Sequence, residues 1–177
     1  LTFDHLRFER YQSVLNFEGS AATQSTYNSG NEVLYCYFYQ IGEYWLTGQG
    51  PATYVVRLQN SRDNEVAYNW FVSIRNSEGP ELIHPIYVAH WASGNEIHDN
   101  KFNISSGDTI RIRDESNYNH VYSNDSSEQG EHALVNDWYD ADGGECPSWG
   151  TDIEYNTSDG IYDCDGPQNF YYDYGLG

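Results

Sequence analysis

Short apolar runs separated by polar turns fill the first two thirds of the chain. The runs are rich in Val, Ile, Tyr, Phe and Trp, which β-strands favour. Clusters of Asn, Ser, Gly and Pro separate them at intervals of roughly 8–14 residues, the spacing of a β-sandwich. No convincing helical period occurs beyond the N-terminus. The pattern therefore predicts an all-β protein with strands over Glu32–Gln40, Ala52–Leu58, Val66–Arg75, Leu82–Trp91 and Asp108–Arg113.

Two local patterns favour an immunoglobulin-like β-sandwich with its core over residues 31–113. Residues 54–60 and 66–74 are expected to form two strands joined by a polar turn. Residues 102–113 contain a strand, a Gly turn and then a strict alternation of apolar and polar side chains. This stretch resembles many extracellular immunoglobulin-like sandwiches. The alternation directs Ile110 and Ile112 to one face and the polar residues to the other, namely Thr109, Arg111 and Arg113.

The amino-acid composition excludes several classes of protein. The 177 residues carry a formal net charge of −19, but 16% of them are aromatic, which excludes a disordered chain. The 8 basic residues are too few and too scattered for a nucleic-acid surface. No apolar run reaches the roughly 18 residues that a membrane span requires.

The acidic residues concentrate in the C-terminal third. Residues 1–113 have a net charge of −4 and include all the Lys and Arg, whereas residues 114–177 have a net charge of −15. This second segment also holds Trp138, Trp149 and Phe170 together with 8 Tyr, which a merely solvating tail would lack. We therefore expect a folded, loop-rich elaboration over 114–177 that packs on the sandwich.

Several features indicate an extracellular protein. The chain begins with Leu and contains no Met, as expected after removal of a signal segment. Three sequons offer candidate glycosylation sites at Asn103, Asn124 and Asn156. Cys146 and Cys164 bracket a 17-residue polar interval and are predicted to form a disulfide, whereas Cys36 lies in an apolar strand and is expected to be a buried thiol.

The acidic segment also contains a candidate metal site. Alternating acids followed by Gly suit a hard cation such as Ca²⁺, although the full calcium-loop pattern is not met. The candidate ligands are Asp137, Asp140, Asp142 and Glu145, and a solvated acidic surface is the alternative. A second acidic group surrounds Cys164, at Asp159, Asp163 and Asp165. The six histidines lack metal-binding spacing and are expected to be ordinary.

Exposed aromatic rings permit a carbohydrate-binding function, because Trp and Tyr stack on sugar faces. The candidates are Trp138, Tyr139, Trp149, Tyr171, Tyr172 and Tyr174, and the alternative is that these rings cover a thin core. No catalytic motif is present, and a pair of carboxylates among 27 acids is no specific signal of a glycosidase. We therefore expect no enzyme.

The N-terminus suggests a role in assembly. Leu1, Phe3, Leu6 and Phe8 form two short alternations with a bulge between them, and residues 19–30 form a polar linker. A strand separated in this way either folds back onto its own domain or pairs with a neighbour's open sheet edge.

This arrangement resembles the subunits of donor-strand-exchange fibres, which are secreted immunoglobulin-like domains. The resemblance implies that residues 1–18 are a donor strand whose plugs, Leu1, Phe3, Leu6 and Phe8, fill a groove in the next copy. The sequence thus predicts a structural subunit of an extracellular homopolymer. The alternative is a secreted carbohydrate-binding or adhesive module, with or without a stabilising calcium ion.

Overall fold

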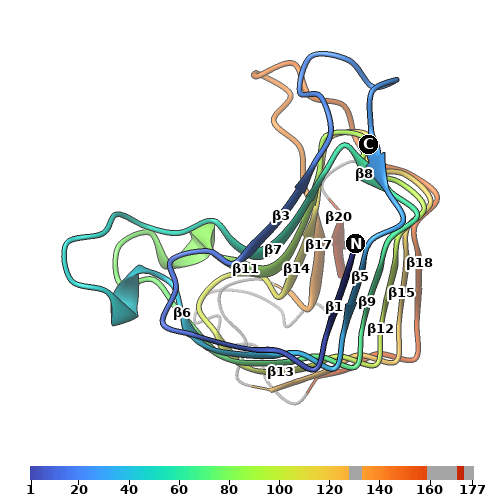
Figure 1. Ribbon diagram of the computed structural model, residues 1–177. Helices are drawn as coiled ribbons and strands as arrows, with labels where there is room; N and C mark the ends of the chain where they lie inside the picture. Colours follow the sequence, from blue (N-terminus) through green and yellow to red (C-terminus); the bar gives the residue numbers. More distant parts are fainter. Residues whose placement is uncertain (128–132, 159–170, 174–177) are drawn as a thin grey trace.

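The chain winds into a parallel β-helix (Figure 1). The structure, a computed structural model, describes residues 1–127, 133–158 and 171–173. In this part of the chain, six successive coils each contribute one strand to each of three six-stranded sheets. Every strand pair is parallel. Figure 1 views the coils nearly end-on, so the strands of one sheet lie behind one another.

The three sheets take their strands in the same order along the chain. Sheet A contains β1 (Thr2–Asp4), β5 (Glu32–Leu34), β9 (Glu65–Ala67), β12 (Glu96–His98), β15 (His120–Tyr122) and β18 (Asp152–Glu154). Sheet B contains β2 (Arg7–Glu9), β6 (Tyr37–Ile41), β10 (Trp70–Ile74), β13 (Lys101–Ser105), β16 (Asp125–Ser127) and β19 (Thr157–Ser158). Sheet C contains β3 (Leu15–Glu18), β7 (Tyr54–Gln59), β11 (His84–Ala89), β14 (Ile110–Ile112), β17 (Val135–Asp137) and β20 (Tyr171–Asp173).

The remaining elements belong to the connections between sheets. β4 (Asn28–Ser29) and β8 (Ser61–Arg62) form a small two-stranded sheet between sheets C and A. Two short 3₁₀ helices, η1 (Glu43–Trp45) and η2 (Pro80–Leu82), lie between sheets B and C. Among the described residues, no helix has the length and apolar character needed to cross a bilayer.

The core consists of like residues stacked from coil to coil, because parallel in-register strands place equivalent positions directly above one another. In sheet B the rings of Phe8, Phe38, Phe71 and Phe102 stack with centroid separations of 5.2, 4.7 and 5.0 Å. Sheet A aligns a second inward column at intervals of about 24–33 residues: Phe3, Val33, Val66, Ile97, Val121 and Ile153.

A ladder of buried asparagines connects successive coils at the corner that leads into sheet A. The Oδ1 atom of Asn95 accepts hydrogen bonds from the backbone N–H and the side-chain Nδ2 of Asn64, at 3.1 and 2.7 Å. Asn31 and Asn64 are linked in the same way, as are Asn95 and Asn119. The amides thus satisfy backbone groups that the sharp corner removes from the sheets.

A second asparagine ladder lies at the corner between sheets A and B. Asn69, Asn100, Asn124 and Asn156 are joined through the same pair of bonds, at 2.9–3.1 Å. In every coil the residue before this position has a positive φ, as at Tyr35 and Tyr68. The left-handed residue turns the chain sharply enough for the next side chain to point inward.

The predicted immunoglobulin-like sandwich is therefore wrong, although most predicted strands exist. The predicted run Glu32–Gln40 divides into β5 and β6 at the corner of Tyr35, and Val66–Arg75 divides into β9 and β10. Sandwiches are built from antiparallel strands, whereas all the strand pairs described here are parallel. Strand direction depends on the connections and leaves no mark on local alternation, which both folds share.

The N-terminal segment forms the first coil of its own chain. β1 pairs with β5, β2 with β6 and β3 with β7, all in register. The expected bulge is the A–B corner at His5, which has a φ of 53°. Phe3 and Phe8 pack against the core, whereas Leu1 and Leu6 are exposed. These residues fold back on their own domain, as in the alternative above, and not as a detached strand.

The predicted disulfide is a second correction. Cys146 is an exposed free thiol, and Cys164 lies outside the described residues. Cys36 is buried as predicted, and burial raises the pKa of its thiol. It occupies the place of an asparagine in the A–B ladder, where its backbone N–H donates to Asn69 Oδ1 at 2.9 Å.

We predict that Asn100→Ala lowers the free energy of unfolding by about 2–4 kcal/mol, because several buried polar groups lose their partner. Asn103→Ala is the matched control: Asn103 is half-buried on the outer face of β13 and bonds Ser127. Urea unfolding measures both. Equal losses of unfolding free energy in the two variants would contradict a special contribution of the ladder to stability.

Candidate functional site

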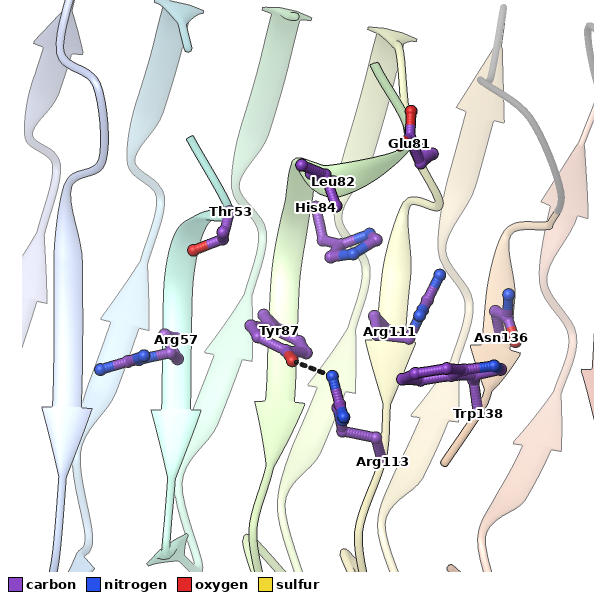
Figure 2. Close-up of a pocket in the computed structure, with 10 residues that line it drawn as sticks. All are labelled: Thr53, Arg57, Glu81, Leu82, His84, Tyr87, Arg111, Arg113, Asn136 and Trp138. Carbon is purple, nitrogen blue, oxygen red and sulfur yellow. Dashed lines mark hydrogen bonds between the residues drawn. The ribbon is translucent and has the colours of Figure 1, made fainter. Parts of the chain in front are cut away.

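A cavity of about 520 Å³ lies on the outer face of sheet C. The strands β7, β11, β14 and β17 form its floor, and the connections between sheets B and C overhang one end. Figure 2 shows the side chains that line it: Tyr87, Arg113 and Trp138 lie close together, whereas Arg57 extends along the sheet away from them. The lining residues are Thr53, Arg57, Glu81, Leu82, His84, Tyr87, Arg111, Arg113, Asn136 and Trp138.

Parallel register sets the spacing of the side chains on the cavity floor. Arg57, Tyr87, Arg111 and Asn136 occupy the same level on four neighbouring strands. Neighbouring strands are about 4.8 Å apart, so Arg57 and Arg111 start from positions about 10 Å apart with Tyr87 between them. The predicted alternation places Arg111 and Arg113 on this outer face and Ile110 and Ile112 in the core, and the structure confirms it for these four residues. Thr109, predicted to share the face of the arginines, is instead fully buried, with its hydroxyl 3.5 Å from Ser126 Oγ.

A buried carboxylate holds Arg111. Asp108, whose side chain is fully buried, forms an ion pair with Arg111 through its Oδ2 atom. The same Oδ2 accepts a bond from Asn136 Nδ2 at 3.0 Å, and Oδ1 accepts one from the backbone N–H of Ala133 at 3.1 Å. The guanidinium is therefore fixed in orientation, and its charge is balanced from below.

Arg113 is fixed in a similar way at the other end of the cavity. It donates to both oxygens of Glu145 and to the Tyr87 hydroxyl, the latter at 3.0 Å. Burial disfavours the charged guanidinium, but these bonds outweigh it and raise the pKa of Arg113. Its guanidinium carbon lies 4.5 Å from the centre of the Trp138 ring, and that of Arg111 lies 5.5 Å from it. Trp138 is thus held by two cation–π contacts.

His84 is a neutral hydrogen-bonding group in the cavity. Its side chain is buried, and burial together with the positive charge of Arg111 lowers the pKa of the imidazole to about 3. Nδ1 lies 3.0 Å from the backbone carbonyl of Asp108, which can only accept a bond. Nδ1 therefore carries the proton and Nε2 carries a lone pair.

The structure does not gather the four predicted metal ligands. Asp137 is buried at the end of β17, Asp140 caps its own turn by accepting from Gly143, and Asp142 is exposed. Glu145 is ion-paired with Arg113. Among the described residues, one group has the proximity of a metal site, namely His90, Asp114 and Glu145.

That group fits calcium poorly. Calcium takes oxygen ligands, yet His90 contributes a nitrogen, which lies 2.6 Å from Asp114 Oδ2. Glu145 already neutralises Arg113. The three side chains are better described as part of an ion-pair network. The second acidic group of the sequence, at Asp159, Asp163 and Asp165, lies outside the described residues.

The three sequons occupy different environments. The side chain of Asn124 is buried, and its Nδ2 donates to Ile97, Tyr122 and Asn156 within the ladder. A glycan on that nitrogen would remove ladder bonds, as it would at Asn156, whose Nδ2 donates to Val121. Asn103 is half-buried on the outer face of sheet B, where its Nδ2 donates to Ser127 Oγ at 3.0 Å and takes no part in a ladder.

The aromatic residues that were predicted to bind sugar also lie in different parts of the structure. Trp138 lines the cavity, whereas Trp149 is 60% exposed and packs against Tyr118 outside the cavity lining. Tyr139 is half-buried, and Tyr171 and Tyr172 lie in β20. Tyr174 lies outside the described residues. Sequence reasoning missed Arg57, Tyr87, Glu81 and His84 as members of one site, because only the coil register brings them together.

Comparison with known proteins found no matching family model, no matching curated protein and no matching solved structure. The site therefore has to be interpreted from its own geometry and chemistry.

We predict that His84→Gln flattens the pH dependence of stability. The folded-state pKa of about 3 lies below the unfolded value of about 6.5, so the contribution of His84 is present above pH 6.5 and lost as the pH falls towards 3. Between pH 6 and 4 the wild type should lose up to about 1.4 kcal/mol per pH unit relative to the variant. Urea unfolding at several pH values measures this, with His120→Gln as control for loss of an imidazole. Parallel curves for wild type and His84→Gln would refute it.

Proposed function

We propose that this protein is an extracellular carbohydrate-binding module whose ligand occupies the cavity on sheet C. The observation that carries the proposal is the convergence of Trp138, Tyr87, Arg111 and Arg113 on one concavity in a chain with only 8 basic residues. A concave site with aromatic surface and a few fixed polar groups is the common form of a small-ligand site. An elongated sugar chain suits it, because the floor repeats from strand to strand.

The site is fixed in place before any ligand arrives. Arg111 and Arg113 are held by carboxylates whose side chains are 0% and 13% exposed. Arg57 is held by Asn16 and Glu18, at 2.9 and 3.0 Å. Side chains that are already ordered lose little conformational entropy on binding, which favours affinity. Hydrogen-bond donors that are held beside aromatic rings are suited to binding the hydroxyl groups of a sugar.

Binding without turnover is part of this proposal. Hydrolysis of a glycosidic bond generally uses two carboxylates on either side of it. Within the described lining, Glu81 is the one carboxylate that faces the cavity. Asp108 lies beneath Arg111 with its side chain fully buried.

We predict that Trp138→Ala weakens glycan binding about tenfold or more, because the cavity loses its largest apolar surface. The matched control is Trp149→Ala, which removes the same side chain outside the cavity and should leave affinity unchanged. Glycan-array screening of the 177-residue chain, followed by calorimetry on the best ligand, measures both. A glycan bound equally by wild type and both variants would place the site elsewhere, and the absence of any glycan binding would overturn the proposal.

Self-assembly into an extracellular filament is a second candidate function, favoured by a sheet edge that is unpaired among the described residues of this 177-residue chain. β1, β2 and β3 each have one strand neighbour among the described residues. Because the first coil is folded, assembly would proceed by edge pairing with a second copy and not by donation of a free strand. The net charge of −19 opposes such contacts at low salt.

We predict that Asp4→Pro prevents assembly while preserving the fold. Leu1 and His5 use their backbone groups to bond β5, so by alternation the N–H of Asp4 faces away from it. Light scattering at 0.15 M and about 0.5 M NaCl should show concentration-dependent assemblies of the wild type and monomers of the variant. Monomers of the wild type at both salt concentrations would exclude the filament function.

A further inference from the structure

The cavity floor offers an unpaired acceptor as well as unpaired donors. His84 is 5% exposed, and its Nε2 lone pair has no partner among the described residues. Asn136 is 1% exposed, and its Oδ1 is likewise without a partner in the described part of the chain. Figure 2 shows the imidazole of His84 directed along the floor towards Arg111. The Oδ1 atom of Asn136 is enclosed by protein, whereas Nε2 of His84 is an acceptor in the cavity, so it is Nε2 that points to a ligand donating a hydrogen bond.

The unpaired donors belong to two arginines. Arg57 and Arg111 each use Nε and one terminal nitrogen for the bonds that hold them. Their Nη1 groups make no hydrogen bond with the described residues. The cavity therefore presents an acceptor, His84 Nε2, together with unpaired donors on the arginines. Hydroxyl groups match this set, because each can donate one bond and accept others.

The charge of the cavity is balanced. Each lining arginine has its own carboxylate partner: Arg57 has Glu18, Arg111 has Asp108 and Arg113 has Glu145. Glu81 adds a further negative charge to the rim. An acidic ligand would thus meet no excess of positive charge, and its acceptor-only oxygens would face the lone pair of His84 Nε2.

We propose that the cavity is specific for uncharged, polyhydroxylated sugars, with His84 Nε2 accepting from and Arg111 Nη1 donating to ligand hydroxyls. Arg57 Nη1 is a further donor at the edge of the cavity. This inference rests on the proposed carbohydrate-binding function and specifies its ligand class. It excludes glycans whose recognition depends on carboxylate or sulfate groups.

The first test compares neutral and acidic ligands on the full chain. The probes are hexasaccharides of β-1,4-linked glucose, xylose and mannose, together with hexamers of galacturonate and mannuronate, titrated by calorimetry. Each titration is repeated at 0.15 M and about 1 M NaCl, because the Debye length falls from about 8 to 3 Å and removes long-range repulsion by the net charge. We expect binding of at least one neutral probe and of neither uronate at both salt concentrations.

The second test assigns the contact to His84. His84→Phe removes both ring nitrogens at similar volume, whereas His84→Gln retains an acceptor near the position of Nε2. We expect about a tenfold or greater loss of affinity in His84→Phe and a smaller loss in His84→Gln. His120→Phe, on sheet A, is the matched control, and circular dichroism verifies that each variant folds. One monodeoxy derivative of the bound sugar should lose affinity for the wild type but not for His84→Phe.

The outcomes separate the two proposals. Binding of a uronate with equal or greater affinity at high salt would overturn the neutral-sugar inference and leave the carbohydrate-binding function standing. Unchanged affinity for a neutral sugar in His84→Phe would likewise overturn the inference alone. If neither neutral nor acidic sugars bind, the proposed function fails and the inference fails with it.

Discussion

Hydrogen bonds between buried asparagine side chains are the interaction on which the rest of the structure depends. A parallel β-helix must turn sharply at every corner, and each turn removes backbone N–H and C=O groups from the sheets. Here the amides of Asn31, Asn64, Asn95 and Asn119 replace those partners at one corner, and a second series does so at the next. The ladders fix the register between successive coils. The phenylalanine stack and the spacing of the cavity side chains follow from that register.

Much of the fold was present in the sequence as a repeat. A short motif recurs at intervals of 33 and 31 residues, as Asn31-Glu-Val33, Asn64-Glu-Val66 and Asn95-Glu-Ile97. A Phe stands five residues after the last position of each motif, at Phe38, Phe71 and Phe102. A period of this length is the mark of a solenoid. Alternation along the sequence marked most of the strands, but it carries no information on the direction of their pairing. The sandwich was inferred from spacing that a solenoid shares.

The site could be predicted only in part. Alternation correctly directed Arg111 and Arg113 outward, and Trp138 was a candidate because of its chemistry. The sequence around His84 gave no sign of its role, because its tautomer is fixed by the backbone carbonyl of Asp108, which lies in the connection before the next strand of sheet C. Likewise, the acids of the C-terminal third suggested a cation site, whereas Glu145 instead balances Arg113. Pairing across coils is a property of the three-dimensional register, so local sequence patterns do not show it.

The ladders also tie each coil to its neighbours by bonds in both directions. Each asparagine of the A–B ladder accepts at Oδ1 from N–H groups of the earlier coil, as Asn100 does from Asn69, and donates from Nδ2 to a backbone carbonyl of that coil, as Asn100 does to Val66. Removal of a neighbouring coil therefore leaves both donors and acceptors of the ladder without partners. A coil that carries an asparagine at the same corner would supply them again, so the ladder makes the coil a unit that can be repeated.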